Sequence, residues 1–193
     1  MNSGLAYLDR LSHIELLAKL IGVSESRRLY QGSLKPLFSS PSSGDAPHEV
    51  CVVAKELVRR WLDEELHREC VLSSPGSVRD YLRLFFVGQE YESFVVLFLD
   101  AQNRLIVADE LFRGTLTQTS VYPREIVKET LRHNSAAVIF AHNHPSGVAE
   151  PSKADEMLTS SLKQALSLVD VKVLDHFIVA GPSTLSFAER GLL

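Results

Sequence analysis

Apolar residues follow two different spacings along the chain. Up to about residue 88 they recur every three or four positions, which is typical of amphipathic helices. This spacing predicts a helix of about ten residues from Ser12, a second helix over 49–69 and a third over 77–88. The segment 39–48 between the first two is dense in Ser, Pro and Gly, so we expect a linker there.

The second half of the chain alternates short β-prone runs with helical spacing. The runs 94–99 and 104–112 are separated by the turn residues 100–103, which predicts a hairpin. Further strands are expected at 136–140, 171–174 and 177–180, and further helices from Pro123 and after Pro151. The mixed order predicts an α/β fold with a mixed β-sheet flanked by helices. We expect a small helical N-terminal region over 1–70 and the main domain over 72–193.

Composition limits the class of protein. A chain of 193 residues with 45% hydrophobic and 23% charged residues suits one globular core with an appendage. No apolar run is long enough for a membrane helix, and the start lacks the pattern of a secretory signal. The chain has only two cysteines, Cys51 and Cys70, which are too few for a fold that depends on disulfide bonds. This indicates free thiols in a reducing compartment. We therefore expect a cytoplasmic protein with no membrane partner.

Two histidines directly follow the apolar run 136–140. In an extended strand the spacing of His142 and His144 points both imidazoles to one face. A Pro/Ser/Gly loop then leads to Asp155 in the first turn of a predicted helix, which completes a His, His, Asp set. Nitrogen and oxygen ligands suit zinc, and three of them leave a position open for water. The alternative is that Ser152 and Asp155 merely cap the helix and the histidines are loop residues.

The complete pattern, His-x-His-Pro followed by Ser152 and Asp155, resembles the JAMM (MPN+) metalloprotease motif. Residues 72–193 resemble the RadC-like branch of this JAB-domain family. The resemblance implies an MPN or cytidine-deaminase-like fold, with Zn²⁺ held by His142, His144 and Asp155. It also implies hydrolysis of amide bonds through a metal-activated water. The supporting stretches are Phe98-Leu99-Asp100, Phe112-Arg113-Gly114-Thr115-Leu116, Tyr122-Pro123-Arg124-Glu125, Leu174-Asp175-His176 and Ser186-Phe187-Ala188-Glu189-Arg190-Gly191.

Such hydrolysis needs a carboxylate that moves a proton from water to the leaving amine. Glu92 stands just before the run 94–99, and His142 stands just after the run 136–140. If these strands are antiparallel neighbours, Glu92 meets the histidines, and the resemblance indicates the same residue. Glu110 stays an alternative, because a hairpin would bring the end of its strand near the same place.

Other polar residues near the motif have more than one interpretation. The resemblance implies that the Ser152 hydroxyl stabilises the oxyanion, although the same residue suits a helix cap. Asp175 and His176 either support the ligands or include a buried structural histidine. Asn143 lies between the ligands on the other face of the strand, so we expect it to be structural.

Charge gives DNA binding no support. The net charge is −4, and no long basic cluster is present. In RadC-like proteins the N-terminal region resembles helix-hairpin-helix repeats, in which a Gly-x-Gly turn approaches a phosphate. This chain has no such turn, so a degenerate helical region that packs or supports is favoured over one that binds DNA.

We expect a zinc metallopeptidase or isopeptidase-type hydrolase acting on a peptide or protein. The alternative is a DNA-repair-associated or protein-binding module with a structural metal site.

Overall fold

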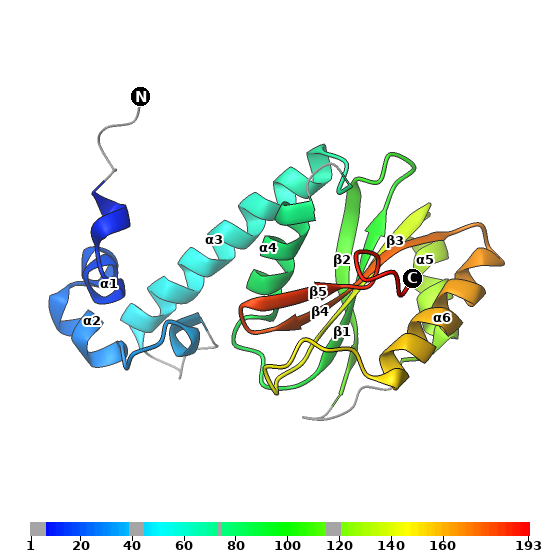
Figure 1. Cartoon of the computed structure of the whole chain (residues 1–193). Helices are drawn as coiled ribbons and strands as arrows, with labels where there is room; N and C mark the ends of the chain where they lie inside the picture. Colours follow the sequence, from blue (N-terminus) through cyan, green and yellow to red (C-terminus); the bar gives the residue numbers. More distant parts are fainter. Residues whose placement is uncertain (1–6, 39–44, 73–74, 115–120) are drawn as a thin grey trace. The chain divides into compact units, whose positions relative to one another are not determined.

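The computed structural model describes residues 7–38, 45–72, 75–114 and 121–193 (Figure 1). The chain forms two compact units, Met1–Val58 and Arg59–Leu193. Their boundary falls inside the helix α3 (Ala46–Arg68). The domain boundary near residue 70 that the sequence indicates stays a prediction.

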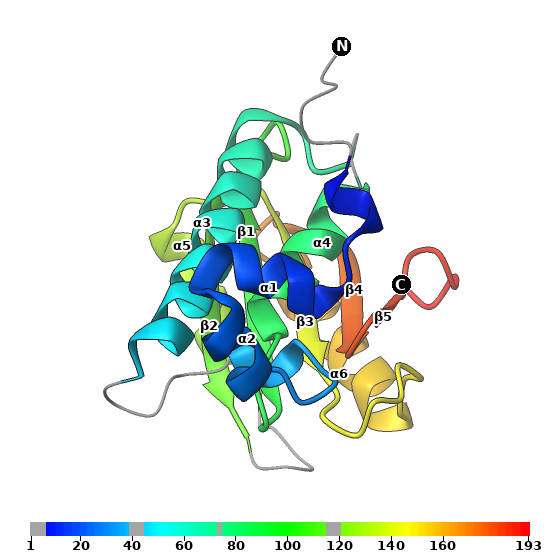
Figure 2. The same ribbon diagram turned by 90° about the vertical axis from the view of Figure 1, so that its left-hand side faces the viewer.

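The first unit is helical. It contains η1 (Leu8–Arg10), α1 (His13–Ile21), α2 (Val23–Leu29), η2 (Lys35–Phe38) and the first part of α3. The helices α1 and α2 lie side by side in both views (Figure 1 and Figure 2).

The beginning of α1 confirms the prediction from Ser12. The Ser12 side chain accepts a hydrogen bond from the Glu15 N–H, and the Glu15 carboxylate accepts one from the Ser12 N–H. This reciprocal cap satisfies two backbone donors that the first turn leaves unpaired. Of the expected linker, residues 39–44 lie outside the described residues, and 46–48 already form the first turn of α3.

The second unit is built on a five-stranded sheet with the order β2-β1-β3-β4-β5. The strands β3 and β4 are parallel and the other neighbours are antiparallel, so the predicted mixed sheet is confirmed. The runs 171–174 and 177–180 form one continuous strand, and β5 was not expected because its sequence is mostly polar. The strands are β1 (Ser93–Leu99), β2 (Leu105–Arg113), β3 (Ala137–Asn143), β4 (Lys172–Ala180) and β5 (Ser183–Ser186).

Helices cover both faces of this sheet, as Figure 1 shows. The helix α4 (Pro75–Phe86) packs with Val95 and Leu97 on one face. The helices α5 (Pro123–Arg132) and α6 (Lys153–Ser167) pack with Phe94 and Val96 on the other. Successive side chains of a strand point to opposite faces, and both faces are covered by helices. All residues of β1 are therefore buried, which is why its sequence is almost continuously apolar.

Within the described residues, no helix has both the length and the apolar character needed to cross a membrane.

Candidate metal centre

The side chains of His142, His144 and Asp155 converge at the end of β3. The His142 Nε2 lies 3.0 Å from the His144 Nε2 and 3.3 Å from an oxygen of Asp155. The His144 Nε2 lies 3.9 Å from the other Asp155 oxygen. His142 is buried, whereas His144 and Asp155 keep partial exposure, so solvent reaches this cluster from one side.

The hydrogen bonds of His144 fix which of its nitrogens faces the cluster. Its Nδ1 lies 2.8 Å from the carbonyl oxygen of Val148, which can only accept a hydrogen bond. The proton of a neutral ring is therefore on Nδ1, and Nε2 presents a lone pair to His142 and Asp155. Acceptors this close repel one another unless a proton or a metal ion lies among them.

The spacing of the three groups fits a metal ion. Ligand atoms about 2.0–2.1 Å from zinc at tetrahedral angles lie about 3.3–3.4 Å apart. The His142 Nε2 lies 3.0 Å from the His144 Nε2 and 3.3 Å from Asp155 Oδ1, and both separations are close to that value. The distance of 3.9 Å from the His144 Nε2 is to the second oxygen of Asp155, Oδ2. The donor set, two imidazoles and one carboxylate, is also one that zinc accepts. These residues are therefore a candidate metal-binding group.

The helix cap at Ser152 orients the Asp155 carboxylate. The Ser152 N–H and hydroxyl each donate to Asp155 Oδ2 at 2.7 Å, and the Asp155 N–H donates to Ser152 Oγ at 3.2 Å. This leaves Oδ1 facing the His142 ring. Burial opposes ionisation, but contacts with His142 and hydrogen bonds from Ser152 hold the pKa of Asp155 well below its usual range. The cap and the ligand interpretations of the motif are thus compatible, because the cap fixes the carboxylate.

The arrangement of strands brings Glu92 beside this group. β1 runs antiparallel to β3 with Phe94 opposite His142, which is the arrangement under which Glu92 was expected to meet the histidines. Glu92 directly precedes β1, and continuing the alternation of this strand by one residue puts its side chain on the same sheet face as Phe94. Burial raises the pKa of Glu92, and its carboxyl also interacts with His142, His144 and Asp155, the two histidines lowering that pKa. Glu92 is therefore an acidic neighbour of the candidate ligands.

Glu110 lies on the opposite face of the sheet. It is paired with Val95, whose side chain packs on the α4 side, whereas Phe94 packs on the side of α5 and α6. Burial raises the pKa of Glu110, and the charge that opposes this shift is Arg113 rather than a histidine. The geometry favours Glu92 over Glu110 as the carboxylate beside the metal group.

Asn143 fastens the backbone on both sides of Glu92. Its amide Nδ2 donates to the carbonyl of Tyr91 at 2.8 Å, and its Oδ1 accepts from the N–H of Ser93 at 2.8 Å. The Glu92 carbonyl accepts a further bond from the Gly114 N–H at 2.8 Å. The structural role expected for Asn143 is thus a specific one, since it fixes the segment that carries Glu92.

Replacing Asn143 with alanine is expected to lower the free energy of unfolding by about 2–4 kcal/mol, because it leaves buried backbone groups without a partner. Urea denaturation of the full chain measures this loss. Gln164→Ala removes an amide from the exposed side of α6 and should cost less than about 0.5 kcal/mol. A loss of similar size in both variants would contradict the role given to Asn143.

The neighbours Asp175 and His176 have different roles. His176 is fully buried, and its Nε2 lies 2.8 Å from the Nδ1 of His142, so it supports that ring. Asp175 instead accepts hydrogen bonds from Ser186 and Ala188 and holds the turn after β5. Sequence reasoning missed Thr159, which contacts His176 from α6. Its position one helical turn after Asp155 was the available signal.

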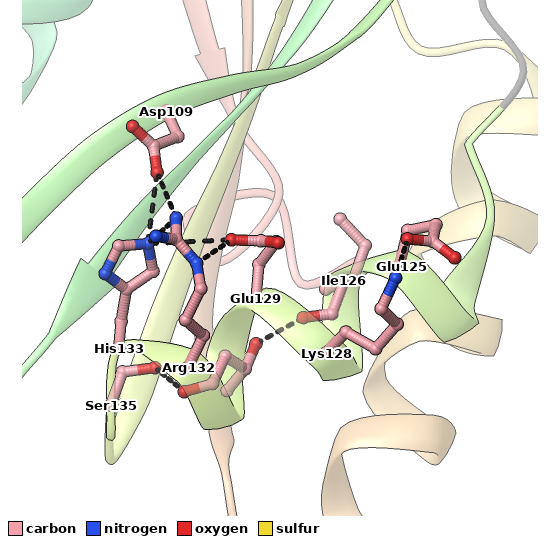
Figure 3. A network of polar contacts seen from close by, with 9 residues as sticks. Asp109, Glu125, Ile126, Lys128, Glu129, Arg132, His133 and Ser135 are labelled. Atoms are coloured by element: carbon pink, nitrogen blue, oxygen red, sulfur yellow. Dashed lines mark hydrogen bonds and ion pairs between the residues drawn. The ribbon is translucent and has the colours of Figure 1, made fainter.

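A second group of potential ligands lies between β2 and α5 (Figure 3). The Nε2 of His133 is 3.1 Å from an oxygen of Asp109 and 3.8 Å from one of Glu129. The guanidinium of Arg132 lies among them, 2.5 Å from Glu129 and 2.8 Å from the His133 Nε2. A metal ion would have to displace this cation. The group at His142 is therefore the better candidate.

Comparison with known proteins agrees with this geometry. A family model described as RadC-like JAB domain matches residues 72–192, which include Glu92, the three candidate ligands and His176. The chain belongs to the RadC-like JAB domain family.

Curated relatives of this RadC-like chain carry the name UPF0758 protein. The one from Nitrosomonas eutropha is 58% identical over 166 residues, covering 86% of this chain and 74% of the relative. The one from Nitrosospira multiformis is 56% identical over 179 residues, covering 93% and 79%. A third, from Dechloromonas aromatica, is 60% identical over 166 residues, covering 86% and 74%. Membership of the JAB family is consistent with a metal-dependent hydrolase, while these names state no activity.

Proposed function

We propose that this RadC-like protein is a zinc-dependent hydrolase of amide bonds, a metallopeptidase or isopeptidase-type enzyme acting on a peptide or protein. The observation that carries the proposal is the convergence of His142, His144 and Asp155 beside the half-buried carboxyl of Glu92. Structural zinc sites usually have four protein ligands, whereas catalytic sites have three and keep one position open. Among the described residues, three ligands meet here, which favours catalysis over a purely structural metal.

The ligands and Glu92 would have separate roles. His142, His144 and Asp155 would hold the zinc ion, which when bound would lower the pKa of water towards about 7 and polarise the substrate carbonyl. Glu92 would accept a proton from the attacking water and return it to the leaving amine. The position of Glu92 supports this role, because its partly buried carboxyl interacts with all three candidate ligands and so lies close to any water held by the metal.

Ser152 would stabilise the negative charge that develops on the substrate oxygen. In the structure its hydroxyl donates to Asp155 Oδ2, so this role requires the hydroxyl to turn away. The backbone N–H of Ser152 donates to the same oxygen at 2.7 Å. Asp155 would therefore keep one hydrogen bond from the cap while the hydroxyl turned to the substrate.

The proposal can be tested with a peptide library derived from a bacterial proteome. The full chain would be stripped of metal, divided, and assayed without metal and with zinc restored, with new peptide amino termini counted by mass spectrometry. We expect new termini in the zinc-restored sample and their loss on chelation. Zinc-loaded protein that releases no new termini, or release that persists after chelation, would contradict the proposal.

A further inference from the structure

A chain of hydrogen bonds connects two of the candidate ligands through the protein interior. It runs from the Nδ1 of His142 to the Nε2 of His176 over 2.8 Å, and from the Nδ1 of His176 to the hydroxyl of Thr159 over 2.6 Å. The Thr159 hydroxyl lies 2.6 Å from the backbone carbonyl oxygen of Asp155. The chain therefore begins at one ligand, on β3, and ends at the backbone of another, on α6.

The carbonyl at one end and the burial of His176 together fix the direction of every hydrogen bond in the chain. A carbonyl oxygen only accepts, so the single hydroxyl proton of Thr159 points to Asp155. The Thr159 oxygen must then accept from His176, which places a proton on the His176 Nδ1. His176 is fully buried, and its two ring nitrogens contact a hydroxyl and another imidazole rather than a carboxylate. A charged ring would be buried there without a counter-ion, so the ring is neutral and its Nε2 is an acceptor.

The consequence reaches the ligand itself. Because the His176 Nε2 accepts, the His142 Nδ1 must carry a proton and donate it. In its neutral form His142 then has its lone pair on Nε2, the atom that faces His144 and Asp155. The opposite direction would place a proton on this Nε2 and prevent it from binding a metal.

We propose that Thr159 and His176 are positioning residues that set the zinc affinity of this protein, an inference that rests on the proposed zinc-dependent function. They hold the His142 ring in one tautomer and one orientation, and they tie β3 to the first turns of α6. Both side chains are buried, with exposed fractions of 2% for Thr159 and 0% for His176. Water therefore does not readily replace a lost partner in the chain.

The test is the zinc dissociation constant of the full chain, measured by competition with a chromophoric chelator. Thr159→Val keeps the shape of the side chain and removes the hydroxyl, so it leaves the His176 Nδ1 without an acceptor. Loss of such outer partners typically weakens metal binding 10- to 100-fold, and we expect a loss of about that size. Thr159→Ala, which adds no new bulk, should show the same loss, and Thr159→Ser should restore most of the affinity.

Thr130→Val is the matched control. Thr130 is buried in α5, and its hydroxyl donates to the carbonyl of Ile126 four residues earlier, as Thr159 donates to Asp155. Both variants lose the same kind of helix hydrogen bond. Thr159→Val also leaves the buried Nδ1 of His176 without an acceptor, so it should lower the unfolding temperature of the metal-free protein somewhat more than Thr130→Val. Zinc affinity should fall only for Thr159→Val, which a merely structural role would not produce.

The outcomes separate this inference from the proposed function. If the unmodified chain binds zinc and both Thr159→Val and Thr159→Ala bind it equally tightly, the positioning role is wrong while the zinc site stands. An equal loss of affinity in Thr130→Val would also overturn it. If the unmodified chain binds no zinc, the proposed function fails, and this inference fails with it.

Discussion

Replacing Glu92 with glutamine is expected to lower kcat at least about a hundred-fold while zinc content stays unchanged, because proton transfer by a positioned side chain contributes about 10²- to 10⁴-fold. Glutamine has nearly the same shape but cannot accept the proton. Glu92 is not among the three converging ligands, so its replacement should leave the metal in place. Steady-state kinetics on a cleaved peptide, with metal analysis of the same sample, measure both quantities.

Glu110→Gln is the control for this prediction. Glu110 also has a pKa raised by burial, but it is paired with Val95 and lies on the other face of the sheet from His142. Its replacement should change kcat by less than about three-fold, because substitutions at exposed positions away from a site usually change free energies by less than about 0.5 kcal/mol. A large loss for Glu110→Gln together with normal turnover for Glu92→Gln would show that the base has been assigned to the wrong strand.

Replacing His142 with alanine is expected to weaken zinc binding about a hundred- to a thousand-fold. Zinc binds to four-ligand zinc-finger peptides with free energies of about 10–16 kcal/mol, so one ligand contributes about 2.5–4 kcal/mol. This loss should be larger than that for Thr159→Val, since His142 itself would contact the metal. The same chelator competition compares the two variants directly.

His133→Ala is the matched control for the second group. His133 lies with Asp109 and Glu129 in the other cluster of potential ligands, where Arg132 already supplies a positive charge. Its replacement should leave zinc affinity unchanged within about two-fold, since it touches no ligand of the first group. Loss of zinc in His133→Ala, with normal binding in His142→Ala, would show that zinc binds to the second group and not to the first.

The sequence predicted the parts of the fold that depend on local spacing. Strand alternation at His142 and His144 and the capping pattern of Ser152 and Asp155 are short-range features, and the structure brings these side chains together. Such features need no knowledge of distant contacts. The antiparallel pairing of β1 with β3 is a long-range contact, which entered only as the condition under which Glu92 would meet the histidines, and the structure meets that condition.

Features that depend on packing or strand register were not predictable. A bulge between Phe94 and Val95 shifts the register of β2, so the face on which Glu110 lies could not be read from its spacing. The contact of Thr159 with His176 joins α6 to β4 and exists only once both pack on the same sheet face. The strand β5 lies at the edge of the sheet, where it pairs with β4, and three of its four residues are polar. Its sequence therefore shows little of the apolar pattern from which a strand can be predicted.

The central claim is that His142, His144 and Asp155 hold a zinc ion, and metal analysis of the full chain tests it most directly. The protein would be equilibrated with zinc, dialysed and measured by mass spectrometry of the elements, beside Asp155→Ala treated in the same way. We predict about one zinc per chain, the stoichiometry of a single three-ligand site, and its loss in the variant. A metal-replete chain that retains no zinc, or an Asp155→Ala variant that retains as much as the unmodified protein, would contradict the claim.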